Sequence, residues 1–155
     1  MSERVVEILI YIMSEMRRND SVSGKLDILS QDLLDRGYTE SEISSAFTWL
    51  LDKIDGESEE VLQRQQSTSQ YSFRHLHEIE RAIITPEAYG FIIQLKELAI
   101  IDDFDFEQIL ERALMLGVSR VDLAQMKSLA SSILAGSEMF IHGVKYFIDD
   151  QQTIQ

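Results

Sequence analysis

Apolar residues recur at intervals of three and four along most of this chain, a spacing typical of helices and unlike the alternation of strands. Similar repeats predict helices over about residues 3–18 and 25–36, and three more in the second half of the chain. With 45% apolar residues in a chain of 155, we expect a folded, mainly α protein with a real core. The clearest repeat follows Thr39 and consists of Ile43, Ala46, Phe47, Leu50, Leu51 and Ile54, all expected to face inward.

Helix-end signals predict a helix-turn-helix in the first half of the chain. Gly37 suits the left-handed conformation that ends a helix, and Thr39 with Glu42 has the pattern of a capping box for the next helix. A similar pattern recurs later, with Ser119 and Asp122 as the capping pair. Because such caps are generic, two ordinary helical hairpins are favoured over an internal duplication.

A small β-hairpin is expected after the helix-turn-helix. Residues 71–77 show a two-residue alternation that predicts a strand, and residues 61–64 are placed to pair with it. Helices followed by such a hairpin have the order of a winged helix.

We therefore expect two subdomains and a tail. Residues 1–78 form a helix-turn-helix or winged-helix-like subdomain, and residues 79–148 form a C-terminal helical subdomain. In the second, Pro86 fits the first turn of a helix, and the last long helix is expected to end near Gly136. Residues 149–155 are expected to be a flexible tail.

The chain is strongly acidic, with a net charge of −13, and it contains no cysteine. The lack of cysteine excludes disulfides and thiolate zinc sites. No stretch has the basic, apolar and small-residue regions of a signal peptide, and none approaches the roughly 18 uncharged apolar residues of a membrane span. We expect a cytoplasmic protein that does not enter the membrane.

The charge pattern disfavours nucleic acid as a partner. The predicted recognition helix carries Glu40, Glu42 and Asp52 against Lys53, whereas a helix that reads DNA normally offers cations and amides. Arginines on the predicted wing, at positions 64 and 74, are too few to compensate.

No catalytic, cofactor-binding or metal-ligating residue is predicted. The chain lacks a nucleophile elbow, a phosphate loop and a dinucleotide fingerprint. His75 and His77 are the one paired-imidazole motif, which is too few ligands for a metal site. The acidic run at 102–107 lacks the glycine and glutamate of a calcium loop, and it fits the start of a helix, where the dipole favours acids.

Three residues are predicted to contact a protein partner. The first helix is apolar on two faces, so that a face including Ile10 either packs inside the protein or joins an interface, such as a homodimer. Tyr38 and Trp49 are aromatic residues of the kind enriched at binding hot spots. The alternative for both is a role in covering the core.

Several short segments occur in an order and spacing that resemble the bacterial Smg family over most of residues 1–135. They lie at residues 5–11, 32–38, 42–50, 72–74, 78–81, 90–92 and 111–114. The last long helix departs from the pattern, because residues 122–127 lack the tryptophan that Smg-like sequences show there. The resemblance implies a bacterial cytosolic protein from a family of unknown function, with an accessory role near DNA metabolism, and it supplies no catalytic residues.

These observations favour a non-catalytic protein-interaction or accessory protein whose partner is an unidentified protein. The alternative is a winged-helix regulator that binds nucleic acid.

Overall fold

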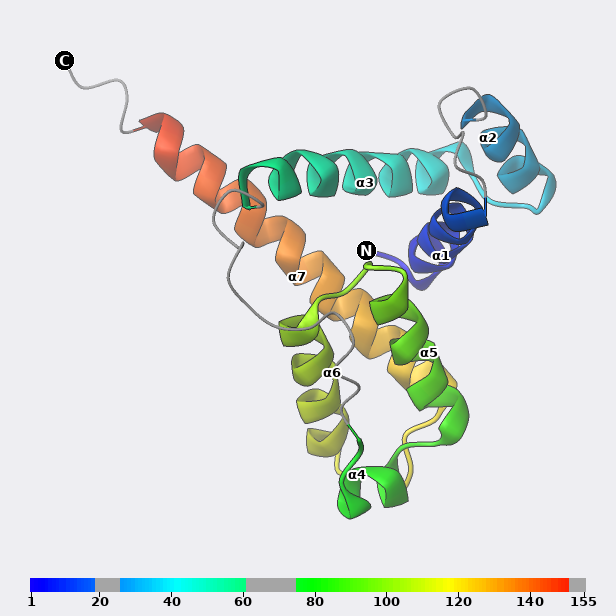
Figure 1. Cartoon of the computed structure of the whole chain (residues 1–155), viewed down its shortest axis with the longest axis vertical. Helices are drawn as coiled ribbons and strands as arrows, with labels where there is room; N and C mark the ends of the chain where they lie inside the picture. The colour runs from blue at the N-terminus through cyan, green and yellow to red at the C-terminus, as the bar shows by residue number, and fades with distance from the viewer. Residues whose placement is uncertain (19–25, 61–74, 151–155) are drawn as a thin grey trace. The chain divides into compact units, whose positions relative to one another are not determined.

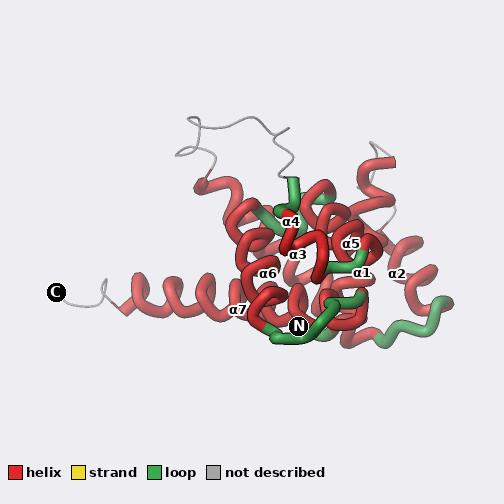
Figure 2. The backbone as a smooth tube through the Cα atoms, turned by 90° about the horizontal axis from the view of Figure 1, so that it is seen from below, coloured by secondary structure: helices red, strands yellow, loops and turns green. Residues whose placement is uncertain are grey.

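The computed structural model describes residues 1–18, 26–60 and 75–150 of the chain. Within them it is helical, with no strand, so the prediction of a mainly α protein is confirmed (Figures 1 and 2). The chain divides into two compact units, one of Arg4–Ala82 and one of Ile83–Gln155 with Met1–Glu3. The helices are α1 (Glu3–Arg18), α2 (Leu26–Asp35), α3 (Glu40–Glu60), α4 (Glu78–Ile83), α5 (Pro86–Glu97), α6 (Asp103–Met115) and α7 (Leu123–Asp150).

The predicted β-hairpin falls mainly outside the described residues, which omit 61–74. The described end of its second strand, residues 75–77, forms a loop that leads directly into α4. In this loop the His77 backbone N–H donates to the Glu80 carboxylate at 2.8 Å, an interaction typical of the start of a helix.

The core of the Arg4–Ala82 unit contains the apolar stripes of its first three helices. Two side chains expected to face inward, Leu51 and Ile54 on α3, are exposed, and so is Leu26 on α2. Helical spacing identifies a face of a helix, but the length of that face that is covered depends on the neighbouring helices. The buried apolar side chains are Val5, Val6, Ile8, Leu9, Ile12, Leu29, Leu33, Ile43, Ala46, Trp49 and Leu50.

The turn between α2 and α3 forms as the helix-end signals predict. Gly37 has a φ of 90°, its N–H donates to the Leu34 carbonyl at 2.9 Å, and the Tyr38 N–H donates to the Leu33 carbonyl at 3.2 Å. This pair of hydrogen bonds is a Schellman motif. The capping box follows: Thr39 N–H donates to the Glu42 carboxylate at 2.9 Å, and Glu42 N–H donates to the Thr39 hydroxyl at 3.2 Å.

In the second unit α5, α6 and α7 pack together, with α5 and α7 running in the same direction and α6 in the opposite one (Figure 1). The segments that precede α5 and α7 lie side by side as a parallel bridge between Ile84 and Val121. Val121 N–H donates to the Ile83 carbonyl at 2.7 Å, and Thr85 N–H donates to the Val121 carbonyl at 3.0 Å. Thr85 also caps α5, and Pro86 occupies its first turn, as expected.

The end of α5 is a second Schellman motif, but with alanine at the left-handed position. Ala99 has a φ of 56°. Its N–H donates to the Lys96 carbonyl at 2.9 Å, and the Ile100 N–H donates to the Leu95 carbonyl at the same distance. Ala99 is exposed and lies beyond the helix.

Two predictions about α7 are wrong. Its N-terminal capping box joins Asp122 and Gln125, through hydrogen bonds of 2.9 and 3.1 Å, so Ser119 is not the cap. The cap positions therefore do not match those of Thr39 and Glu42, which removes the main support for an internal duplication. The helix also continues through Gly136 to Asp150, the second residue of the predicted tail.

Candidate protein-interaction surface

The connection between α6 and α7 carries a cluster of large apolar side chains that solvent reaches. Met115 is the most exposed, at 72%. The chain turns here at Gly117, whose φ of 66° is left-handed. We call the cluster the α6–α7 patch; it consists of Leu114, Met115, Leu116, Val118 and Leu123.

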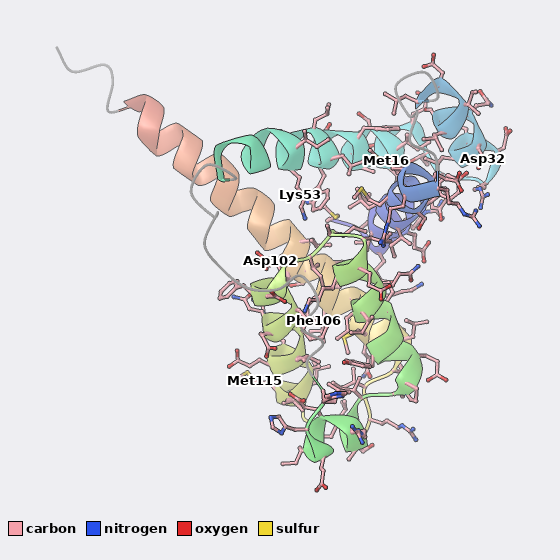
Figure 3. All side chains as sticks on the ribbon, viewed as in Figure 1. Met16, Asp32, Lys53, Asp102, Phe106 and Met115 are labelled. Carbon is pink, nitrogen blue, oxygen red and sulfur yellow. The ribbon has the colours of Figure 1, made fainter. Side chains whose placement is uncertain are left out.

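The outer face of α6 carries exposed side chains as well. Phe104, at the other end of this helix, is 68% exposed. Glu107 and Glu111 are also exposed. Figure 3 shows Met115 on the side of α6 that faces away from α5. The opposite face of α6 is buried, through Phe106, Ile109, Leu110 and Ala113.

The helix that carries this face is held firmly at its N-terminus. Asp102 and Asp105 form a capping box, with hydrogen bonds of 2.8 and 3.3 Å. The Lys96 ammonium pairs with the Asp103 carboxylate at 2.6 Å and lies 5.1 Å from the ring centroid of Phe106. The acids of this run thus start a helix, as the sequence pattern indicated.

The three predicted contact residues lie in the other unit. Ile10 and Tyr38 are half-buried, and Trp49 is only 8% exposed. The Tyr38 hydroxyl donates to Glu7 at 3.3 Å, and its burial, reinforced by the Glu7 charge, raises the pKa of the Tyr38 phenol. The Lys53 ammonium lies 4.9 Å from the centroid of the Trp49 ring. The prediction that they contact a partner stays a prediction, and Trp49 offers little surface for it in this conformation.

Arg36 is engaged within its own unit. Its guanidinium pairs with Asp32 at 2.9 Å and lies 4.5 Å from the Tyr11 ring centroid. The Tyr11 hydroxyl donates to the same carboxylate at 2.5 Å. This hydrogen bond, followed by that from Arg36, lowers the pKa of the Asp32 carboxyl, and the bond to Asp32 raises the pKa of the Tyr11 phenol.

Arg4 has a similar role beside the α2–α3 turn. It pairs with Glu42 at 2.8 Å, donates to the Gly37 carbonyl at 2.7 Å and lies 5.0 Å from the Tyr38 ring centroid. The pKa of the Glu42 carboxyl is lowered, first by the hydrogen bond from the Thr39 backbone and also by the Arg4 charge. Arg4 and Arg36 thus bind helices of one unit to one another.

The described part of the chain contains no group of three or more histidine, cysteine, aspartate or glutamate side chains placed to hold a metal ion. His75 and His77 are both exposed in the loop before α4. No helix in the described ranges combines the length and the apolar character that crossing a membrane requires.

Sequence reasoning missed the α6–α7 patch. It singled out none of the five side chains as exposed. The available signal was the run of three consecutive apolar residues at 114–116, since only part of such a run can face inward on a helix.

The chain was then compared with known proteins. Residues 5–152 match the family model described as "Protein of unknown function (DUF494)". The relatives found include a "Protein Smg homolog" from Halorhodospira halophila, 31% identical over 82% of this chain and 79% of that protein. Another, from Alkalilimnicola ehrlichii, is 30% identical over 86% of this chain and 83% of that protein. No solved structure matches. The chain therefore belongs to the Smg family, and the resemblance read from its short segments is confirmed.

Proposed function

We propose that this chain is a non-catalytic protein of the bacterial cytoplasm that acts by binding another protein through the α6–α7 patch. One observation carries the proposal: five large apolar side chains gather at a single helical connection and remain exposed. Scattered apolar residues are normal on a protein surface, whereas a cluster of this kind usually marks a contact. Met115 is well suited to such a contact because its unbranched side chain adapts to different partner surfaces.

The charges support a protein partner over nucleic acid. The protein carries 27 acidic residues against 14 lysines and arginines. Of the arginines near the α2–α3 turn, Arg4 pairs with Glu42 and Arg36 with Asp32. Phosphate binding would have to break these pairs or add to them against the overall charge. We therefore propose that α2 and α3 form a helix-turn-helix that serves as a scaffold, with Ile10 and Tyr38 as secondary contact residues.

The test is site-specific photo-crosslinking in bacterial cells. A photoreactive amino acid replaces Met115 in the full chain, and the same amino acid replaces Glu87, an exposed residue of α5, as the control. We expect a discrete adduct with one other protein at position 115, lost when Val118→Glu is added, and no such adduct at position 87. The proposal is refuted if position 115 gives no adduct, the same adducts as position 87, or only adducts between two copies of this chain.

A further inference from the structure

We infer that Met115 is a redox-sensitive modification site, and that its oxidation to methionine sulfoxide by hydrogen peroxide releases the partner from the α6–α7 patch. The inference rests on the proposed function, because Met115 is the most exposed residue of that patch.

Solvent access separates Met115 from the other methionines. The chain has six methionines and no cysteine, so thioethers carry all of its sulfur. Among the side chains that the structure describes, that of Met115 is the one exposed methionine, at 72%. Met13 and Met16 on α1 are half-buried, and Met126 on α7 is fully buried. A peroxide dissolved in water should therefore reach the Met115 sulfur first.

The reaction needs only the thioether and the peroxide. The sulfur lone pair attacks one oxygen of hydrogen peroxide, so an S–O bond forms as the O–O bond breaks. The departing hydroxide takes up the proton of the transferred oxygen and leaves as water; sulfur loses two electrons and the peroxide gains them. Methionine sulfoxide reductases reverse the change with a dithiol, which becomes a disulfide while the oxygen leaves as water. The modification can therefore be both made and removed.

Oxidation of Met115 changes the polarity of the patch without reaching the core. A sulfoxide oxygen accepts hydrogen bonds, so it is stable in water but costly against an apolar partner surface. Met115 stands between Leu114 and Leu116 in the chain, where the new oxygen interrupts the apolar cluster. The side chains that hold α6 within its unit lie on its buried face. The unit should therefore stay folded when Met115 is oxidised, whereas oxidation of Met126 would place an oxygen inside the core.

Peptide mapping by mass spectrometry tests the site itself. The purified full chain is treated with hydrogen peroxide, and the sulfoxide at each methionine is followed over time. We expect Met115 to oxidise at least about tenfold faster than Met126, which reacts only when the core opens. In urea the two rates should converge, because unfolding exposes both sulfurs. Equal rates in the folded protein, or a loss of helical circular dichroism when Met115 alone is oxidised, would overturn the inference.

Crosslinking in cells tests the effect on the partner. The photoreactive amino acid replaces Leu116, which is 42% exposed, so that Met115 is retained. A brief peroxide treatment before irradiation should reduce the partner adduct at least about fivefold, the effect of an unpaired polar group at a contact. Met115→Gln, whose amide is close to the sulfoxide in size and polarity, should give a weak adduct without peroxide.

Met115→Leu is the matched control, because leucine is apolar and has no sulfur. Each variant is compared with its own untreated sample, so that a change in basal binding does not affect the ratio. We expect peroxide to leave this ratio near one in Met115→Leu.

Two outcomes overturn the inference and leave the proposed function standing. One is an equal fall of the adduct in Met115→Leu, which means that peroxide acts elsewhere. The other is an unchanged adduct in the chain with native Met115, when mass spectrometry of the same cells finds Met115 oxidised. If position 116 gives no adduct before treatment, the proposed function and the inference are both wrong.

Discussion

Ala99 is the position at which we expect one substitution to stabilise the protein. Its φ of 56° is left-handed, a conformation that costs an L-residue about 1–2 kcal/mol. Glycine avoids this cost, but a glycine loses more backbone freedom on folding than alanine, which offsets roughly 0.4–1 kcal/mol. The Ala99 side chain is exposed, so little packing is lost with its methyl group. Ala99→Gly should therefore raise the free energy of unfolding by about 0.5–1 kcal/mol.

Gly37 provides the matched control, because it ends α2 with the same pair of hydrogen bonds and a φ of 90°. A Cβ added at Gly37 would meet no atom within 4 Å, so the cost of Gly37→Ala is a backbone cost alone. We expect this variant to lose about as much stability as Ala99→Gly gains.

Each variant needs a probe in its own unit, because the two units need not unfold together. Trp49 is the only tryptophan and lies in the same unit as Gly37, so its fluorescence in a urea titration follows Gly37→Ala. Hydrogen exchange of the amides of Leu98 and Ile100 follows Ala99→Gly. If Ala99→Gly leaves this exchange unchanged or speeds it while Gly37→Ala behaves as expected, the backbone at residue 99 is not held in a left-handed conformation.

Three further predictions follow from hydrogen bonds and helix ends. Tyr11→Phe should raise the pKa of Asp32, measured by NMR titration, because the Tyr11 hydrogen bond is the main cause that lowers it. A carboxyl whose pKa is lowered on folding stabilises the protein at pH values above its usual pKa of about 3.9, and this stabilisation is lost as the pH falls through the lowered pKa. Tyr11→Phe should therefore lose less stability in acid than the wild type does. An unchanged Asp32 pKa would contradict the hydrogen bond. Asp122→Ala should cost about 1 kcal/mol and Ser119→Ala almost nothing in thermal unfolding, and the reverse order would restore Ser119 as the cap of α7. Gly136→Ala should stabilise α7 by up to about 1 kcal/mol, whereas a loss of helical circular dichroism would place the helix end at this residue.

The helices were predictable where their signals are local. Thr39 and Glu42 fix the start of α3 through hydrogen bonds within one turn. Gly37 adopts without strain the left-handed conformation that the turn before α3 requires. Local signals did not predict the cap of α7, because two capping pairs fit the sequence equally well. Ser119 with Asp122 and Asp122 with Gln125 are both plausible capping pairs, and the choice depends on the backbone pairing of Val121, which no local pattern contains.

The candidate site was not predictable, because exposure depends on tertiary packing. Leu110 and Leu114 lie one turn apart on the same side of α6, but Leu110 is buried and Leu114, near the helix end, is exposed. The same limit explains Trp49, which looked equally suited to a surface contact and to the core. Side-chain type and spacing define the faces of a helix, whereas the neighbours of each face are set by the rest of the chain.

The bridge between Ile84 and Val121 has a consequence for how the chain length can vary in evolution. Its two hydrogen bonds close a loop that contains all of α5 and α6. Doubling the length of a closed flexible loop costs only about 0.6 kcal/mol, so extra residues in the exposed turn around Gly117 are cheap. Thr85 both donates one of the bridge hydrogen bonds and caps α5. One residue inserted between Ile84 and Pro86 would instead disrupt this double role and turn α5 against α7. Relatives of this chain should therefore differ in length around Gly117 and keep a constant spacing between Ile84 and Pro86.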